Sequence, residues 1–341
     1  MPPDPYLESI RAIARAVVEY VPRDIGEVFR EYTGLSRRDF RPVGPRGSCT
    51  AWAVDGSNVT VLDAPGMTVV AVRAGFSRFR GGEREPAGIT PVLLHAADSP
   101  GAGREFSSLY EECFGVPPRN LPNFDDPSRA AAAIRDTYEY WVALACARRC
   151  ARDDLLLLDG ALRVSEECHD PVLVSIIKES RDRGIHLVAV AKRTAATWGG
   201  KYPLLPAVGA LAQAEGLRSP WWVKIGEDIL DRTRYAQWEH GDVYVCSLAR
   251  GKTVPLKVEL PRGTPEQAAG DAFSLLSACA DDARVEGYPY PLLDVHRHVA
   301  INADVLEKVR SDLMAGFADV GLRASDVDVL FGDYHDTFGR Y

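Results

Sequence analysis

The feature that most constrains this chain is a pair of short apolar segments, each followed directly by Asp-Gly. Residues 155–160 read LLLLDG, and residues 51–56 read AWAVDG. A continuous apolar run of this length, bounded by a turn signal, is typical of a strand buried on both faces of a sheet. We therefore predict two buried strands, each ending on an aspartate: Asp55 in the first and Asp159 in the second.

The segments around these strands predict a mixed β-sheet. β-branched content with Gly and Pro between the runs indicates three successive strands, at 51–55, 67–79 and 90–98, most simply an antiparallel meander. Asp126 and Pro127 then provide a cap and a first-turn proline for a helix that extends to about residue 152.

The chain then alternates strand, helix and strand. The run at 155 is followed by a helical segment over 170–183 and by an apolar strand over 185–194. Strands joined by helices lie parallel, with right-handed crossovers. The expected fold class is therefore α/β, with an antiparallel meander and parallel strands in one sheet flanked by helices.

The two ends of the chain carry further elements. An apolar stripe at helical spacing predicts a helical lead-in over 5–33. Beyond residue 200 the sequence predicts three more strands, within 219–225, 242–250 and 252–260. Helices near 264–281 and 296–316 follow, so we expect a C-terminal β and helical elaboration of the core.

Composition narrows the classes of protein. The 341 residues are 46% hydrophobic, which is enough for a substantial core, and no apolar run approaches the roughly 20 residues that a membrane span needs. The N-terminus lacks the pattern of a signal peptide, so we expect a cytoplasmic protein without a membrane role. Seven cysteines without a CxxC pair argue against a zinc cluster, and the spacing of Cys146 and Cys150 indicates packing on one helix face.

The net charge of −8 argues against indiscriminate coating of nucleic acid, although it leaves room for a local basic channel. Two arginine groups flank the Asp55 strand, one with Arg37 and Arg38 and the other with Arg78 and Arg80. They are candidates for DNA contacts. The alternative is that both groups are solvated loops.

The two strand-end aspartates predict a metal site. If their strands are parallel neighbours, Asp55 and Asp159 emerge side by side, and two ionised carboxylates that close together repel unless a proton or a cation lies between them. Oxygen ligands favour Mg²⁺ or Mn²⁺, which bind phosphates and can activate a water molecule. The alternative is that each Asp-Gly only makes a turn.

A third carboxylate is expected from the helix that begins at residue 127. Glu139 lies off the main apolar stripe and shares a helix face with small residues, among them Ala143 and Cys146. A glutamate among such neighbours is a candidate metal ligand. A solvent-facing helix charge is the alternative.

Near the C-terminus, residues 287–298 read GYPYPLLDVHRH. His296 could orient a water molecule, bind the metal or contact a phosphate, and Tyr288 or Tyr290 could hold a nucleotide. Lys192, at the end of the last parallel strand, could neutralise a phosphate or could form a salt bridge with the two aspartates; the sequence leaves both roles open.

Together these motifs resemble the NurA nucleases, which process DNA ends with the HerA hexameric translocase. The segments that carry the resemblance are AVDGS, IRDTYEY, LLLLDGAL, VAVAKRT and GYPYPLLDVHRHVAI, in that order. The resemblance covers nearly the whole chain from about residue 50. It implies an N-terminal helical segment over 1–46, followed by a NurA-like domain with an RNase H-like core over 47–341.

The resemblance also implies an activity and its site. The expected enzyme is a Mn²⁺-dependent nuclease, with Mg²⁺ as a possible substitute, that acts as a 5′–3′ exonuclease and single-strand endonuclease in DNA-end resection and repair. It would be a homodimer that docks on HerA. Five positions match the catalytic residues of the family pattern: Asp55, Glu139, Asp159, Lys192 and His296. Tyr288 or Tyr290 matches its tyrosine.

Three rival interpretations stay open from the residues alone. An actin-like ATPase or sugar kinase also carries an Asp-Gly turn, but it normally has a duplicated domain, and the sequence has no internal repeat. A haloacid-dehalogenase-type phosphatase needs an aspartate two residues before Asp159, where this chain has Leu157. The third is a non-catalytic adaptor that loads a helicase.

Overall fold

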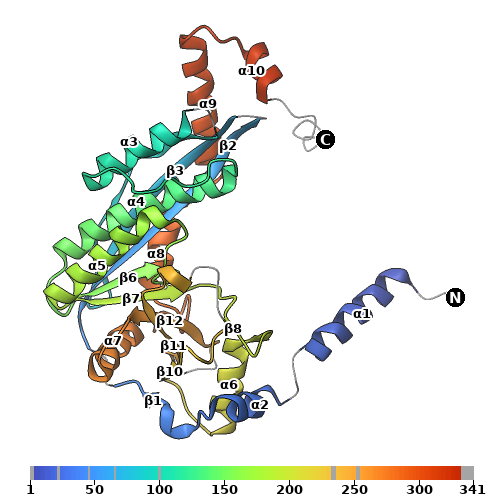
Figure 1. Ribbon diagram of the computed structural model, residues 1–341, viewed down its shortest axis with the longest axis vertical. Helices are drawn as coiled ribbons and strands as arrows, with labels where there is room; N and C mark the ends of the chain where they lie inside the picture. Colours follow the sequence, from blue (N-terminus) through green and yellow to red (C-terminus); the bar gives the residue numbers. More distant parts are fainter. Residues whose placement is uncertain are drawn as a thin grey trace.

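The structure, a computed structural model, describes residues 4–20, 24–44, 47–64, 67–98, 101–231, 236–250 and 254–331 (Figure 1). The expected division at residue 46 lies outside these ranges, as does the chain after residue 331. The α-helices are α1 (Pro5–Tyr20), α2 (Ile25–Thr33), α3 (Ala102–Phe114), α4 (Pro127–Arg149), α5 (Asp170–Arg183), α6 (Leu204–Ala214), α7 (Glu266–Cys279), α8 (Tyr290–Val299), α9 (Ala303–Asp319) and α10 (Ala324–Phe331).

One mixed sheet organises the described residues. Its strands are β1 (Arg41–Pro42), β2 (Thr50–Ala64), β3 (Met67–Arg80), β4 (Glu83–Ile89), β5 (Leu93–Asp98), β6 (Leu155–Asp159), β7 (His186–Ala191), β10 (Trp221–Ile225), β11 (Gly241–Ser247) and β12 (Leu256–Pro261). They are ordered β1-β10-β11-β12-β7-β6-β2-β3-β4, with β5 also paired to β3. A separate small ribbon joins β8 (Thr197–Trp198) to β9 (Tyr202–Pro203).

The pairing confirms the expected α/β class. The β2, β3 and β4 strands run antiparallel, while β2, β6 and β7 are parallel neighbours. In the β2–β6 pairing, Ala51 lies opposite Leu155 and Val54 lies opposite Leu158. The next residues in the two strands, Asp55 and Asp159, are therefore in step.

The expected end of the first strand at Asp55 is wrong. β2 continues to Ala64, and Asp55 and Gly56 pair with Gly75 and Ala74 of β3 in a long antiparallel hairpin. The continuing β3 partner supplies the backbone hydrogen bonds that keep the strand going. Only at Gly160, whose φ is +107°, does an Asp-Gly pair end a strand, because glycine adopts that conformation at little cost.

Two other boundaries differ from those expected. The third strand expected over 90–98 is β5, and an additional strand that was not expected, β4, comes before it; both pair with β3. The single helix expected over 296–316 is instead the end of α8 and most of α9, because Ala300 leaves the helical conformation at φ −57° and ψ 127°. Asn302 then caps the new helix by accepting a hydrogen bond from the backbone N–H of Val305.

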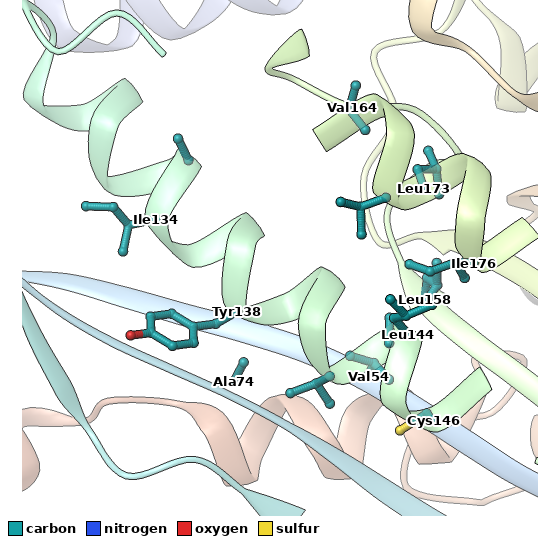
Figure 2. Close-up of a cluster of buried hydrophobic side chains, with 14 of the residues drawn as sticks. Val54, Ala74, Ile134, Tyr138, Leu144, Cys146, Leu158, Val164, Leu173 and Ile176 are labelled. Atoms are coloured by element: carbon teal, nitrogen blue, oxygen red, sulfur yellow. The ribbon is translucent and has the colours of Figure 1, made fainter. Parts of the chain in front are cut away.

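Both faces of the central strands are covered. Helices α3, α4 and α5 lie together on one face, and α7 and α8 pack on the other (Figure 1). Residues of β2 alternate between the two cores: Trp52 and Val54 belong to the α4 side, and Ala51 and Ala53 to the α8 side. Figure 2 shows part of the α4 core, where Ile134 and Tyr138 of α4 lie with Val54 and Leu158.

The two-residue period of a strand decides which way the next side chains point. Asp55 continues the set of Ala51 and Ala53, and Asp159 continues the set of Leu155 and Leu157, so both carboxylates point to the α8 side. Gly56, one residue on, faces α4. This alternation explains why the two aspartates meet one set of partners while α4 approaches from the opposite face.

Peripheral segments complete the fold. β1 pairs with β10, and α2 packs against α6 in a third core that includes Phe29 and Trp198. The α1 helix has no buried residue and extends away from the body of the protein (Figure 1). No helix in the described part of the chain is long and apolar enough to cross a membrane. Cys146 and Cys150 are buried free thiols in the α4 core.

A buried histidine in the α4 core should make the stability of the folded protein depend on pH. His169 is 0% exposed, and its Nε2 lies 2.8 Å from the Thr137 hydroxyl. Because that hydroxyl donates to the carbonyl of Ala133, the network assigns the proton of a neutral His169 to Nε2. Burial lowers the pKa of His169 from 6.5 to about 4.

Acid should therefore destabilise the protein through His169. A base whose folded pKa is depressed contributes full stability above its unfolded pKa, and that contribution is lost as pH falls from about 6.5 toward 4. Between pH 7 and pH 5, the free energy of urea unfolding should fall by about 2 kcal/mol more in the wild type than in His169→Phe. Equal losses in the two proteins would contradict this assignment.

Candidate active site

The centre of the site is an ion triad formed by two aspartates and a lysine. Lys192 follows β7 directly, and its Nζ lies 2.7 Å from Asp159 Oδ2 and 3.3 Å from Asp55 Oδ2. The Asp55 side chain is only 6% exposed, against 22% for Asp159. The predicted proximity of the two carboxylates is confirmed, and so is the salt bridge that the sequence left open for Lys192.

Electrostatics agree with this arrangement. Burial raises the pKa of Asp159, although the ammonium of Lys192 opposes that shift. Burial lowers the pKa of Lys192, but Asp55 and Asp159 outweigh it, so the net shift of the lysine is upward. The Asp159 carboxylate therefore depends on a nearby positive charge to stay ionised where it is partly buried.

His296 joins the triad from α8. Its Nδ1 lies 2.8 Å from Asp55 Oδ2 and 3.1 Å from Lys192 Nζ. One nitrogen cannot donate to the carboxylate and accept from the ammonium at once; the shorter contact to an acceptor-only group favours donation to Asp55. A neutral His296 then carries its free lone pair on Nε2. His298 is engaged elsewhere, with its Nδ1 2.7 Å from the carbonyl oxygen of Asp294.

Glu139 reaches the site from α4, on the other side of β2. Gly56 makes room for it: a Cβ at position 56 would lie 3.0 Å from Glu139 Oε2 and 3.0 Å from Arg135 Cγ. Burial is the largest cause that raises the pKa of Glu139 well above its usual value, and the carboxylates of Asp136 and Asp55 add to it. A bound cation would therefore stabilise the ionised form of Glu139 more than it would stabilise an exposed glutamate.

Replacing Gly56 tests this close approach. In Gly56→Ala the methyl group would push the Glu139 carboxylate away. If Glu139 is a metal ligand of a nuclease, as the sequence and its family resemblance predict, DNA cleavage should fall roughly ten- to a hundredfold, because small displacements of a catalytic group are costly. Gly270→Ala is the matched control, since a Cβ there meets nothing within 4 Å. Steady-state cleavage of a labelled oligonucleotide measures both, and equal rates would contradict the role of Gly56.

Sequence reasoning missed two residues of the site. Asp136 precedes Glu139 by one turn of α4 and is 8% exposed, and both Nε and Nη2 of Arg135 donate to its Oδ1, at 3.1 and 2.6 Å. Both residues lie in the quoted segment IRDTYEY, and the spacing of three between Asp136 and Glu139 was the available signal. The position of Arg135 beside Gly56 could not be read from the sequence.

The structure distinguishes the two candidate tyrosines. The hydroxyl of Tyr288 is buried with no hydrogen-bond partner among the described residues, and burial followed by the charges of Asp159 and Asp55 raises its pKa. Tyr290 lies instead beside Phe79, with ring centroids 5.6 Å apart, and the guanidinium of Arg284 lies 3.9 Å from its ring centroid. Of the two, it is Tyr288 whose pKa the charges of Asp159 and Asp55 raise, although neither tyrosine lines the cleft described below.

The arginine candidates lie apart from the triad. Arg78 and Arg80 are strand residues of β3 that both pair with Glu85, and Arg78 also lies 4.7 Å from the ring centroid of Trp52. They are therefore not on a loop, contrary to one expectation. Arg37 donates to the carbonyl of Glu215, and the side chain of Arg38 is 85% exposed. Neither group lines the cleft described next.

The ion triad, Glu139 and Asp136 all face one cleft of about 1320 Å³. Nine carboxylates line it, against six lysines and arginines. Such a surface repels a phosphate backbone unless a cation accompanies the substrate. The cleft therefore shares the acidic balance that argued, from the sequence, against indiscriminate coating of nucleic acid.

The donor set fits a hard divalent cation in chemistry. Asp55, Glu139 and Asp159 offer carboxylate oxygens, which suit Mg²⁺ and Mn²⁺. In geometry the described residues hold no group of three or more acidic, histidine or cysteine side chains placed to bind one metal ion, and the ammonium of Lys192 lies between the two aspartates. A shared cation would have to take the place of that ammonium.

Comparison with known proteins identifies the family. The model of the NurA domain matches residues 49–301. The chain belongs to the NurA family. A search of curated proteins found no match. The NurA domain covers β2 to the end of α8 and so contains every residue of the ion triad, Glu139 and both tyrosines.

Solved NurA structures share the fold at low identity. The NurA nuclease from Sulfolobus solfataricus matches with a TM-score of 0.57 and 14% identity, over 92% of this chain and 96% of that one. A NurA with manganese matches with a TM-score of 0.56 and 10% identity, over 93% and 99% of the two chains. A NurA bound to dAMP and manganese matches with a TM-score of 0.53 and 10% identity, over 95% and 99%. The expected mixed-sheet architecture is thus confirmed, and membership of the NurA family supports a nuclease.

Proposed function

We propose that this protein is a Mn²⁺-dependent deoxyribonuclease that processes DNA ends. The observation that carries the proposal is the pair of carboxylates, Asp55 and Asp159, held in step by parallel strands in an acidic cleft with Glu139 opposite. The NurA structures with manganese, and with dAMP and manganese, support both the ion and a nucleotide product. Mg²⁺ is a second candidate ion.

The proposed division of labour follows from the positions of the side chains. Asp55, Asp159 and Glu139 would hold the cation, which when bound supplies an activated water and steadies the leaving oxygen. Asp55 orients His296 through the Nδ1 contact, and the ring lines the cleft, where its Nε2 would be available to hold a proton during the reaction. Lys192 would neutralise a phosphate.

Contacts to the rest of the DNA are assigned by chemistry. Tyr288 offers a hydroxyl that has no partner among the described residues beside the two aspartates. Tyr290 presents a ring at the start of α8, and the arginine groups, Arg37 with Arg38 and Arg78 with Arg80, would contact phosphates outside the cleft. We include these residues as DNA-binding candidates of lower rank than the triad.

A metal-dependence assay tests the proposal. Wild type and Asp159→Asn are incubated with end-labelled linear DNA and with closed circular single-stranded and double-stranded DNA, in Mn²⁺, Mg²⁺ or chelator. We expect the wild type to degrade linear DNA and single-stranded circles in Mn²⁺, with release of the 5′ label, and chelator or Asp159→Asn to stop it. Degradation that persists in chelator would refute the metal site, and ATP hydrolysis in its place would favour the ATPase interpretation.

The proposed setting is DNA-end resection in the cytoplasm with the HerA translocase, by a homodimer. Light scattering during gel filtration gives the oligomeric state, and co-purification with HerA tests the partner. A protein that stimulates HerA without degrading DNA in any divalent ion would instead be the loading adaptor.

A further inference from the structure

We propose that Lys192 occupies the place of the catalytic metal ion, and that its displacement by the ion delivers the ammonium to the substrate phosphate, so that metal and phosphate bind cooperatively. The inference rests on the proposed function, since it concerns the same cation. It assigns to Lys192 two positions, one between the aspartates and one on the substrate.

The first position follows from the distances. Lys192 Nζ contacts the Oδ2 atoms of both aspartates, at 2.7 Å from Asp159 and 3.3 Å from Asp55. A Mg²⁺ ion shared by the same carboxylates would lie about 2.0–2.1 Å from its ligand oxygens, closer than the ammonium does. Two positive centres that use the same oxygen atoms would be closer together than their charges and sizes allow. Ion and ammonium therefore exclude each other at this point.

The second position follows from where the lysine is attached. Lys192 lies just beyond the end of β7, and its side chain is 33% exposed and lines the cleft. An ammonium on a flexible four-carbon stem can swing away from the aspartates without moving the strand. The cleft into which the ammonium swings carries an excess of carboxylates. A phosphate that enters the cleft would therefore be strongly stabilised by the positive charge of Lys192.

His296 keeps Asp55 in place during this exchange. Its Nδ1 holds the same Oδ2 atom that Lys192 contacts, at 2.8 Å, from the α8 side. When the ammonium leaves, Asp55 retains this hydrogen bond and the one that its Oδ1 accepts from the backbone N–H of Gly56. The carboxylate therefore stays oriented while only the lysine moves.

The consequence is that the metal ion and the substrate phosphate bind cooperatively. A phosphate that attracts the ammonium removes a competitor of the metal, and the metal in turn releases the ammonium for the phosphate. Thermodynamic linkage requires both effects to have the same size. A cleft built in this way binds metal weakly until substrate arrives.

The test measures Mn²⁺ binding directly, by electron paramagnetic resonance of the free ion, in the full-length protein. Lys192→Met should bind Mn²⁺ roughly tenfold more tightly than the wild type, since the competitor is gone. Addition of dAMP, which has no phosphodiester bond to hydrolyse, should tighten Mn²⁺ binding several-fold in the wild type and much less in Lys192→Met. DNA cleavage by Lys192→Met should fall despite the tighter metal.

Two variants serve as controls. Lys192→Arg keeps the positive charge and should bind Mn²⁺ no more tightly than the wild type. Lys224→Met removes a comparable ammonium, 2.7 Å from the buried Asp242, that lies outside the cleft, and it should leave Mn²⁺ binding unchanged. Thermal unfolding of each variant without metal shows whether it is folded.

The possible outcomes distinguish a failure of this inference from a failure of the proposed nuclease function. If the wild type degrades DNA with Mn²⁺ but Lys192→Met binds the ion no more tightly, or keeps the full effect of dAMP, the exchange is overturned and the nuclease stands. If the wild type neither binds Mn²⁺ nor degrades DNA, the proposed function is wrong, and the inference is wrong as well. A folded Lys192→Arg variant that binds Mn²⁺ as tightly as Lys192→Met would also overturn the exchange.

Discussion

Asp55→Asn is expected to reduce Mn²⁺-dependent DNA degradation by at least about a hundredfold while the protein stays folded. The asparagine keeps the volume of a side chain that is 6% exposed, and Lys192 retains its 2.7 Å contact with Asp159, so no charge is left buried alone. The loss comes from the missing anionic ligand and from the replacement of one carboxylate oxygen by an amide NH2, since the two oxygens of Asp55 separately contact Gly56 N–H and His296 Nδ1. Release of labelled nucleotides from linear DNA measures it.

Asp242→Asn is the matched control for this prediction. Asp242 is also a buried carboxylate on a central strand with a lysine partner, but its side chain does not line the cleft. We expect this variant to lose some stability and to keep its nuclease activity. Full activity in Asp55→Asn, or equal losses in the two variants, would show that the carboxylate pair is not the catalytic site.

Glu139→Gln should have opposite effects on activity and on stability. Activity should again fall by at least about a hundredfold, because a neutral amide is a poor ligand for a hard cation. The melting temperature without metal should rise at pH 8, because the variant no longer has to ionise a carboxyl group among Asp136 and Asp55. Thermal unfolding across a pH series, with and without Mn²⁺, measures both effects.

The sign of the pH effect follows from the raised pKa of Glu139. An acid whose pKa is higher in the folded state lowers stability as pH rises from its unfolded value of 4.5 through the folded one. The stability of the wild type should therefore approach that of Glu139→Gln near pH 4.5 and fall behind it at higher pH. Mn²⁺ should stabilise the wild type more than the variant, since only the wild type has all three carboxylates. A variant that is less stable than the wild type at pH 8 would contradict the buried position of Glu139.

The fold and the centre of the site were largely predictable from local patterns. The run LLLLDG is too apolar to be anything but a buried strand, and helices between strands at 155 and 185 require them to be parallel. Because side chains alternate along a strand, two such strands in step bring Asp55 and Asp159 to one face. Glu139 could be selected from its small neighbours on α4, since bulky residues there would leave it no access to the sheet.

The features that the sequence analysis predicted wrongly, or missed, are those that depend on residues distant in the sequence. Asp-Gly at 55–56 is indistinguishable locally from a turn, and only the β3 partner, which pairs with β2 well beyond Asp55, keeps the strand going. The contact of Gly56 with Glu139 and Arg135 likewise depends on how closely α4 packs on the sheet. The break between α8 and α9 at Ala300 was missed because local propensity cannot locate the end of a packed helix.

The sequence by itself therefore determined the α/β class, the parallel neighbours and the identity of the carboxylates, because hydrophobic periodicity acts over a few residues. Only the tertiary structure decided that Lys192 lies between Asp55 and Asp159, and that α4 brings Glu139 and Arg135 against Gly56. Those placements are set by side-chain packing between separate elements of the fold, and no short-range pattern in a single sequence records the distances involved.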